Sequence, residues 1–415
     1  MAGITPAELA AVGDRLEAFA AEVFVSLPRT DQRARGACYL RGLMLDGRRK
    51  SIEPMAARLG GQVHYQALHH FVAVSPWDWR PVRRRLAERL CQELEPTVWA
   101  VDDTGFPKDG KCSVGVQRQY FEYSGTLGKT GNCQLGVSVN AVTEQASCPL
   151  DWRLFVPEGW DDPAMATRRA ACQLPEQVHH RPKWQLALDM LDELAGWDLR
   201  PPVLVADCGY GEVGEFRGGL DERQIPYVVQ VRADTSAHPE QVRPVAAPYA
   251  GKGRRPQPRY HDQPSSLQQL ALAAGQHACV DLIWRRGSKG LQRSRFAALR
   301  VRPAGVTPRR QAAREGLEEL PVRWLLVEWP QGEPEPVKYW LSNLPADTRL
   351  VELVRLGKLR WRIEQDYREL KGALGLDHFE GRSWPGWHHH VTLVSVAHGF
   401  LTLERQRSPN LVASA

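Results

Sequence analysis

The sequence predicts an α/β protein with a mixed sheet flanked by helices, a helical N-terminal domain and a β-rich insertion. Three observations predict it. Residues 5–95 carry apolar positions at helical spacing. Three apolar runs typical of buried strands, Thr97–Val101, Val203–Ala206 and Pro226–Val231, alternate with helical patterns further along. Strand-like alternation then dominates residues 279–341. A chain of 415 residues with this order of elements is expected to form two or three domains.

The N-terminal region begins with a helix signal. Thr5 is a suitable N-cap, Pro6 follows at the first helical position, and Glu8 completes the pattern. Further on, a short helix over residues 51–59 ends at two glycines, and a second amphipathic helix covers Tyr65–Val74. A helix, a glycine turn and a helix fit a helix-turn-helix, although any corner of a helical bundle gives the same pattern.

Basic residues lie on both sides of this pair of helices. Such runs are usually solvated faces. Because these runs flank the unit that is best placed to touch a duplex, we expect them to contact phosphates. The residues expected to bind DNA in this way are Arg48, Arg49, Lys50, Arg83 and Arg84.

Pro96 marks a boundary, after which the strand Thr97–Val101 leads into Asp102 and Asp103. Residues 110–123 and 133–143 alternate like strands, and the glycine-rich residues 124–132 connect them, so we expect a three-stranded antiparallel meander. A helix is predicted over Lys183–Trp197. The apolar run Val203–Ala206 then ends at Asp207, and a helix near residues 213–223 leads to the next buried strand.

Residues 232–346 differ in composition and are predicted to be a β-rich insertion. Residues 236–267 are rich in Pro and Gln, and strands are expected near residues 279–286, 294–301, 322–328 and 337–341. A final helix is expected from His388 to about Arg405. Its three consecutive histidines point about 100° apart on a helix and cannot share one metal ion, so we expect them at the surface or in an interface.

A stretch near the C-terminus, residues 356–371, combines charge with helical spacing. On one continuous helix, Arg360, Glu364, Tyr367 and Lys371 share a stripe, and Glu369 falls on the opposite face. A solvated helix with ordinary Glu–Arg pairs is the alternative interpretation. Because Glu369 faces away from the stripe, Glu369→Gln is expected to be tolerated.

Composition narrows the class of protein. Hydrophobic content of 43% and charged content of 25% are typical of a soluble globular protein. The sequence has no apolar run of membrane-spanning length and no signal-peptide pattern, so an intracellular protein without membrane contact is expected. Eight cysteines without a CxxC pair favour reduced thiols. A net charge of +6 with clustered arginines permits a polyanionic partner.

Three acidic residues suggest the chemistry. Asp103 and Asp207 follow predicted strands, and Glu364 lies on a predicted helix. If they converge, three carboxylates provide the hard oxygen ligands that Mg²⁺ or Mn²⁺ prefers, and two such ions suit phosphoryl transfer. Arg360 and Lys371 would hold the phosphate backbone. Each aspartate also has a structural interpretation: Asp103 as a turn former and Asp207 as a helix cap.

These residues lie in three motifs that resemble a known family. The motifs are Val101–Lys108 (VDDTGFPK), Ala206–Gly211 (ADCGYG), and Arg360–Glu364 (RWRIE) with Lys371. They are similar to those of bacterial DDE transposases of the IS701 group within the IS4-like superfamily. The third is similar to the signature Y-x2-R-x3-E-x6-K, except that Gly357 stands where a tyrosine is expected.

The resemblance implies an RNase H-like catalytic core, with Asp103, Asp207 and Glu364 as catalytic residues and ligands of two Mg²⁺ or Mn²⁺ ions, and Asp102 as the reserve candidate. It implies cleavage at insertion-sequence ends and strand transfer, with double-stranded DNA (terminal inverted repeats and target) as partner. A homodimer on DNA and a cytoplasmic, nucleoid-associated location are expected. A metal-dependent nuclease without strand transfer and an inactive, domesticated DNA-binding protein are the alternatives.

The expected domain layout follows from the elements and the resemblance together. Residues 1–95 are expected to form the DNA-binding domain. Residues 96–231 and 347–405 are expected to form the two parts of the catalytic core, separated by the insertion at 232–346. A disordered tail is expected at 406–415.

Overall fold

The computed structural model describes residues 5–121, 129–249, 251–252, 258–287 and 290–407. The chain divides into two compact units. Unit 1 contains residues up to Arg200 and from Trp361 onward, and unit 2 contains Pro201–Arg360. The chain thus leaves unit 1 once and returns to it once. The glycine-rich connection expected at 124–132 lies mostly outside the described residues, as does most of the tail expected at 406–415.

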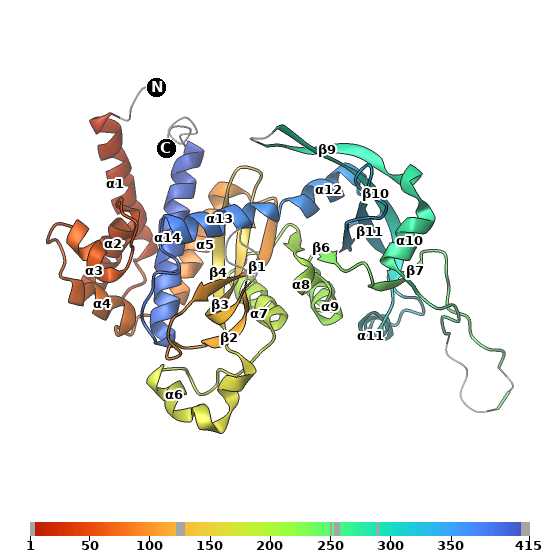
Figure 1. The fold of residues 1–415 in the computed structure, drawn as a ribbon, viewed down its shortest axis with the longest axis horizontal. Helices are drawn as coiled ribbons and strands as arrows, with labels where there is room; N and C mark the ends of the chain where they lie inside the picture. The colour runs from red at the N-terminus through yellow and green to blue at the C-terminus, as the bar shows by residue number, and fades with distance from the viewer. Residues whose placement is uncertain (1–4, 122–128, 250, 253–257, 288–289, 408–415) are drawn as a thin grey trace. The chain divides into compact units, whose positions relative to one another are not determined.

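Unit 1 combines N-terminal helices, an antiparallel sheet and two C-terminal helices (Figure 1). Its strands are β1 (Val98–Pro107), β2 (Gln117–Phe121), β3 (Lys129–Val142) and β4 (Ser147–Phe155). Its α-helices are α1 (Pro6–Val23), α2 (Thr30–Met44), α3 (Ile52–Arg58), α4 (Tyr65–Ala73), α5 (Arg80–Leu94), α6 (Ala166–Ala171), α7 (Lys183–Ala195), α13 (Trp361–Gly372) and α14 (Trp384–Arg407). Two short 3₁₀ helices, Glu158–Asp161 and Pro163–Met165, precede α6. The predicted capping box at Thr5 and Glu8 is present.

The order of the strands differs from the predicted meander. Strand β3 is central: it pairs antiparallel with β1 along one edge, and with β4 and the short β2 along the other. Strand β4 was missing from the prediction. Because its sequence lacks a clean alternation and both of its faces are largely buried, the period-2 signal that identifies half-exposed strands is absent.

Helices cover both faces of this sheet. In an antiparallel pair, directly opposite residues point to the same face and successive residues to opposite faces. Trp152 of β4 donates its indole N–H to Ser395 of α14 at 2.9 Å, so α14 lies on the Trp152 face. Arg153, the next residue, bonds to Glu193 of α7 and identifies the other face. The sheet is therefore enclosed between α14 and α7.

The N-terminal helices pack on α14, and the three consecutive histidines of α14 take part in this contact. His388, His389 and His390 are all buried, so of the two expected positions, the surface or an interface, the surface is wrong. His389 bonds through its two ring nitrogens to the carbonyls of Val72 and Trp77 at 2.8 Å each, and His390 lies 2.9 Å from the Tyr39 hydroxyl. Because each imidazole has a polar partner on a different helix, the histidines bind α14 to the helical layer.

Unit 2 contains a mixed sheet in the order β5-β6-β12-β11-β10-β7-β8, and β9 also pairs with β10. Strands β5 and β6 are parallel, as their buried apolar sequences predicted, and the other strand pairs among the described residues of this unit are antiparallel. The strands are β5 (Leu204–Ala206), β6 (Tyr227–Val231), β7 (Ser236–Pro239), β8 (Ser265–Ser266), β9 (Val280–Gly287), β10 (Gly290–Pro303), β11 (Arg323–Glu328) and β12 (Lys338–Ser342). The helices are α8 (Cys208–Gly211), α9 (Gly214–Glu222), α10 (Leu267–Ala274), α11 (Val306–Arg314), α12 (Leu350–Lys358) and the 3₁₀ helix Gln276–Ala278.

Helices α10 and α12 both pack on the unit 2 sheet. Leu267 and Ala271 of α10 join an apolar cluster with Val301 and Leu325 of the sheet. Lys358, at the end of α12, bonds to Glu328 at 2.6 Å, and its ammonium group lies 5.0–5.4 Å from three aromatic ring centres. Those rings belong to Trp284, Phe296 and Trp340. The β-rich character was predicted correctly for β9 to β12, whereas α10 and α11 were not predicted.

The stretch predicted as one helix over residues 356–371 is divided. Helix α12 ends at Lys358 and α13 begins at Trp361. The stripe that included Arg360 is therefore wrong, because its angles assume a continuous helix. Glu364, Tyr367 and Lys371 remain together on α13.

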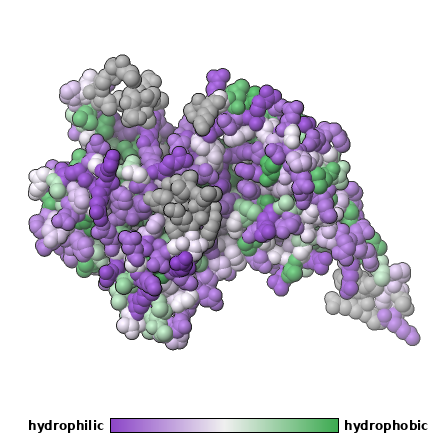
Figure 2. All heavy atoms as spheres, viewed as in Figure 1, coloured by the Kyte–Doolittle hydropathy of each residue, from purple (hydrophilic) through white to green (hydrophobic). Residues whose placement is uncertain are grey.

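Among the described residues no helix is long and apolar enough to cross a membrane. Figure 2 shows a mainly hydrophilic face with scattered hydrophobic residues.

Candidate nuclease site

The adjacent acids Asp102 and Asp103 point to opposite faces of the unit 1 sheet. Asp102 lies opposite Ser138 of β3, and Ser138 lies opposite Trp152 of β4, so these three share the face covered by α14. The Ser138 hydroxyl is 2.7 Å from the hydroxyl of Tyr367 on α13. Helix α13 therefore packs on the Asp102 face of the sheet. Tyr367, which makes this contact, follows Glu364 by three residues on the same helix.

Asp103 faces helix α7 instead. Both of its carboxylate oxygens accept hydrogen bonds from the ammonium group of Lys183, at 3.0 Å each. Lys183 is the first residue of α7, and its side chain is partly exposed. Asp102 in turn accepts a hydrogen bond from the backbone N–H of Asp103 at 2.8 Å. The two carboxylates thus have different surroundings although they are neighbours in sequence.

Glu364 is exposed on α13, and two buried side chains of the same helix attach it to the sheet. Tyr367 bonds to Ser138, and Lys371 donates to the carbonyl of Gly105 at 2.8 Å. Lys371 is only 3% exposed, and burial lowers its pKa to about 8. In this structure the ammonium group of Lys371 positions α13 against β1, and its contact with a phosphate stays a prediction.

Glu369 lies on the other side of α13, as predicted, but it is not solvated. Both of its carboxylate oxygens bond to the guanidinium of Arg405 on α14, one of them at 2.7 Å. These hydrogen bonds and the nearby His398 lower the pKa of Glu369 against the effect of burial. Glu369→Gln removes one side of a half-buried ion pair, so the expected tolerance is not supported.

Asp207 ends strand β5 in unit 2 and caps the following helix. Its side chain accepts a hydrogen bond from the backbone N–H of Tyr210 at 3.3 Å. The structural interpretation of Asp207 as an N-cap is thus correct, and a capping carboxylate retains oxygen lone pairs for another ligand. Gly211, at the end of this short helix, allows it to approach β6: a Cβ atom there would lie 2.0 Å from the carbonyl oxygen of Gln230.

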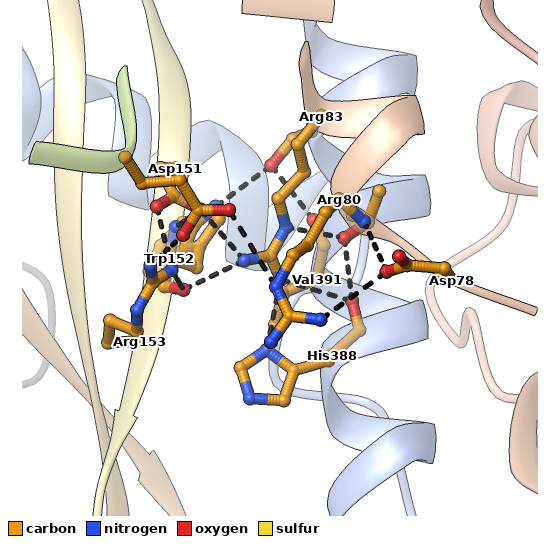
Figure 3. Close-up of polar contacts among 11 residues, drawn as sticks. Asp78, Arg80, Arg83, Asp151, Trp152, Arg153, His388 and Val391 are labelled. Atoms are coloured by element: carbon orange, nitrogen blue, oxygen red, sulfur yellow. Dashed lines mark hydrogen bonds and ion pairs between the residues drawn. The ribbon is translucent and has the colours of Figure 1, made fainter. Parts of the chain in front are cut away.

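Two of the basic residues expected to bind DNA are buried. Lys50 is 4% exposed and donates to the carbonyl of Leu45. Arg83 is 2% exposed and lies in a polar network between α5, β4 and α14 (Figure 3). Its guanidinium bonds to the Asp151 carboxylate at 2.9 Å and to the Thr392 hydroxyl at 2.7 Å. Burial of the Arg83 charge is unfavourable by itself. The Asp151 carboxylate and the other polar partners of the guanidinium compensate for the water that it loses.

The other predicted basic contacts remain accessible. Arg48, Arg49 and Arg84 are exposed, and Arg360 is partly exposed. Arg49 forms an ion pair with Glu380 at 2.5 Å, and Arg84 forms one with Glu88 at 2.7 Å. Exposed pairs of this kind are weak, so a phosphate can displace them at little cost.

The carboxylates offer the type of ligand that magnesium prefers. Asp102 and Glu364 come from unit 1 and Asp207 comes from unit 2. Among the described residues, no group of three or more His, Cys, Asp or Glu side chains is gathered so that it could hold a metal ion. The donor set nevertheless consists of hard carboxylate oxygens, which fit Mg²⁺ or Mn²⁺.

The contact between Lys183 and Asp103 is one that sequence reasoning missed. A lysine at the start of an amphipathic helix carries no signal of its own. The strand period could have separated Asp102 from Asp103, since adjacent residues of a strand face opposite ways. Which face receives α13 depends on tertiary packing, and the sequence does not specify it.

Comparison with known proteins identifies the family. The sequence model described as "DDE superfamily endonuclease" matches residues 22–291, which is well over half of the chain. The chain belongs to this family. The match includes Asp102, Asp103 and Asp207 and ends before Glu364.

A curated relative supports the same assignment. The chain is 31% identical over 196 residues to "Probable transposase for insertion sequence element IS701" from Microchaete diplosiphon. That alignment covers 46% of this chain and 47% of the relative, so the chain spans about half of the relative's length. The resemblance to DDE transposases of the IS701 group is thereby confirmed.

A solved structure is similar over most of the chain. It is described as "Cryo-EM structure of piggyBac transposase synaptic complex with hairpin DNA (SNHP)". The similarity covers 96% of this chain and 73% of that chain, at 9% identity and a TM-score of 0.38.

Proposed function

We propose that this protein is a DNA transposase that cleaves the ends of an insertion sequence and joins them to target DNA. Membership of the DDE endonuclease family and the IS701-like relative support DNA cleavage as the reaction class. Strand transfer, terminal inverted repeats and target DNA as substrates, and a homodimer on DNA are parts of this proposal. So are an RNase H-like core and the domain layout expected from the sequence.

The proposed ligands of the metal are Asp207, Glu364 and one carboxylate of the Asp102–Asp103 pair. The sequence favoured Asp103, whereas the strand face favours Asp102, because Asp102 shares the face on which α13 packs. Asp103 is held by Lys183 on the other face. Bound Mg²⁺ or Mn²⁺, two ions in the proposal, would neutralise charge on the attacked phosphodiester and activate the attacking oxygen.

The surrounding residues position these carboxylates. Tyr367 and Lys371 fix α13 on the sheet, so the direction in which Glu364 projects is set within unit 1. The Asp207 side chain is oriented by its bond to the Tyr210 N–H. Of the proposed ligands, Asp207 belongs to the part of the chain in unit 2 and the others belong to unit 1.

The observation that carries the site proposal is the division of Asp102 and Asp103 between two sheet faces, and it can be tested directly. Asp102→Asn and Asp103→Asn are the matched pair, with Asp207→Asn and Glu364→Gln as further variants. Each amide keeps the side-chain shape and weakens the metal ligand. Labelled DNA carrying the element ends is incubated with each variant and Mg²⁺, and binding and cleavage are read on gels.

We expect Asp102→Asn, Asp207→Asn and Glu364→Gln to bind DNA ends normally and lose cleavage by at least about a thousandfold. Asp103→Asn is expected to retain cleavage. The opposite result for the two aspartates would assign the first ligand to Asp103. Cleavage without joined products in the wild-type chain would indicate a nuclease, and binding alone would indicate an inactive DNA-binding protein.

Helices α3 and α4 are proposed to contact the element ends. They match the predicted helix, glycine turn and helix, and exposed Arg48 and Arg49 lie directly before α3. Arg48→Gln with Arg49→Gln is expected to weaken DNA binding and reduce its salt dependence, without changing the metal concentration required for cleavage.

A further inference from the structure

The strand pair β9–β10 in unit 2 extends beyond the sheet that it belongs to. Strand β10 pairs with β11 only from Phe296 to Val301. The preceding part, from Gly290 to Arg295, pairs with β9 alone among the described residues. Figure 1 shows this strand pair extending away from β11. Its outer half is therefore a two-stranded ribbon that does not contribute to the core of the sheet.

One face of this ribbon is covered and the other is open. Trp284 of β9 and Phe296 of β10 pack around Lys358 of α12, which identifies the covered face. Ile283 points the opposite way and is 52% exposed, and its cross-strand partner is Arg293, which is exposed as well. The register shifts between Gln292 and Arg293, so the alternation of faces is interrupted after Ile283, and Arg286, opposite Leu291, is the arginine of β9 that shares this open face.

The ribbon is strongly basic. From Val280 to Arg295 the sequence has five basic residues and one acidic residue, Asp281. Asp281 pairs with Arg293 at 2.6 Å, which leaves a clear positive excess. Arg286 is exposed, and exposed Leu291 lies opposite it. Figure 2 shows hydrophobic residues among hydrophilic ones over this strand pair.

We propose that the β9–β10 ribbon is a DNA-binding surface that lies in a groove of duplex DNA. A two-stranded ribbon has the dimensions of the major groove, its arginines reach the phosphates on either side, and an exposed aliphatic side chain such as Ile283 contacts thymine methyl groups. This surface lies in the inserted part of the chain, apart from α3 and α4. The proposal rests on DNA being the substrate.

The test compares two pairs of adjacent arginines in the full-length chain. Arg285→Gln with Arg286→Gln changes the ribbon. Arg309→Gln with Arg310→Gln is the control, because these residues are exposed on α11 of the same unit and their loss changes the net charge equally. Binding to a fluorescent duplex is measured at several salt concentrations, and the slope of log affinity against log salt is compared.

The ribbon variant is expected to lower the slope by about 1 to 2, one counterion release per lost phosphate contact, whereas the control pair leaves it unchanged. Equal slopes for the two double variants would overturn the proposal. Thermal unfolding of each variant verifies that it is folded.

A second measurement leaves the arginines intact. A photo-crosslinking benzoylphenylalanine at Leu291 is compared with one at Leu317, which is similarly exposed on the same unit (51% and 48%). Crosslinks to the duplex at position 291 alone support the proposal, and crosslinks only to a second copy of the chain contradict it. Failure of the wild-type chain to bind any DNA would refute the proposed function. Normal DNA cleavage by a ribbon variant with an unchanged salt slope would refute this inference alone.

Discussion

Arg83 and Arg84 are consecutive in the sequence but differ in burial. Arg84 is exposed and pairs with Glu88 one turn further along α5. Arg83 is buried, and its guanidinium reaches β4 and α14. Burial lowers the pKa of Arg83 to about 10, and the Asp151 charge opposes that change. One run of basic residues in the sequence therefore contains a solvated side chain, Arg84, and a buried side chain, Arg83, that connects α5 to β4 and α14.

This difference predicts different costs of mutation. Arg83→Met is expected to lower the free energy of unfolding by about 3–5 kcal/mol, because Asp151 loses a partner while it remains buried. Because Arg153 also bonds to Asp151, the loss of unfolding free energy is expected near the lower end of this range. Arg84→Met, the control, is expected to change stability by no more than about 0.5 kcal/mol. Urea unfolding followed by circular dichroism measures both, and equal losses would contradict the assigned role of Arg83.

Asp366 predicts a pH dependence. It lies on α13, is 4% exposed and accepts a hydrogen bond from Ser147. Burial raises its pKa from 3.8 to about 7, and the charges facing it are Arg362, Glu369 and Arg405. Between these pH values the folded protein keeps a proton that the unfolded chain releases. Its contribution to stability is therefore present below pH 3.8 and is lost as the pH rises to 7.

Asp366→Asn removes this titration while it keeps an acceptor for Ser147. The stability of the variant minus that of the wild type is expected to increase from pH 4 to pH 7, by no more than about 4 kcal/mol. Urea unfolding at several pH values measures the difference. A difference independent of pH would show that the pKa of Asp366 is not raised in the folded protein.

At the scale of elements, short α8 illustrates how the backbone positions an acid. Asp207 caps this helix, and Gly211 ends it against the main chain of β6. The capping role follows from Asp207 directly preceding a helix, but the close approach at Gly211 depends on a strand about twenty residues away in the chain. Sequence alone shows a glycine and not the surface that it contacts.

Gly211→Ala is expected to be strongly destabilising. The added Cβ would lie 2.0 Å from a carbonyl oxygen of β6, so α8 must move, at a cost of at least about 3 kcal/mol. Gly110→Ala is the control, because nothing lies within 4 Å of its Cβ position, and a change within about 0.5 kcal/mol is expected. Thermal unfolding compares the two, and a stable Gly211→Ala chain would contradict the close packing of α8 and β6.

The break between α12 and α13 limits what periodicity predicts. No proline interrupts residues 356–371, so the pattern favoured one helix. The structure ends α12 where Lys358 lies among three aromatic rings and starts α13, in which Tyr367 and Lys371 bond to β3 and β1. Long-range contacts decide this boundary. The prediction that Glu364 shares a helical face with Tyr367 and Lys371 holds, because all three lie within α13.

At the scale of the whole chain, local signals predicted elements well and their assembly less well. The strand before Asp207, the parallel pair β5–β6, and helices α1, α7 and α9 were predicted to within a few residues, whereas β1 was predicted to end at Val101 and continues through Asp102 and Asp103 to Pro107. Strand β4, helix α10 and the burial of His388 to His390 were not predicted. Each of these depends on which surface of the fold covers the segment, and hydrophobic period reports exposure only where one face is solvated.

The N-terminal helices belong to the same compact unit as the unit 1 sheet and do not form a unit of their own. Their polar contacts reach α14, about three hundred residues later: Tyr39 bonds to His390, Val72 to His389 and Arg83 to Thr392. Phe19 also packs on Phe400, with ring centres 5.6 Å apart. Helix α14 is buried along most of its length and fills the space that a separate helical domain would fill with its own residues.

A fragment of residues 1–95 is therefore expected not to fold on its own, since removal of α14 exposes its apolar face and leaves Arg83 without its acceptors. We expect a broad, non-cooperative urea transition and poorly dispersed amide signals in its NMR spectrum, whereas full-length protein unfolds cooperatively. His389→Ala in the full chain is the milder counterpart: it removes two hydrogen bonds to the helical layer and is expected to cost about 1–3 kcal/mol. A fragment with a sharp transition and dispersed signals would show that the N-terminal helices are an independent domain, and that α14 packs against a surface already formed.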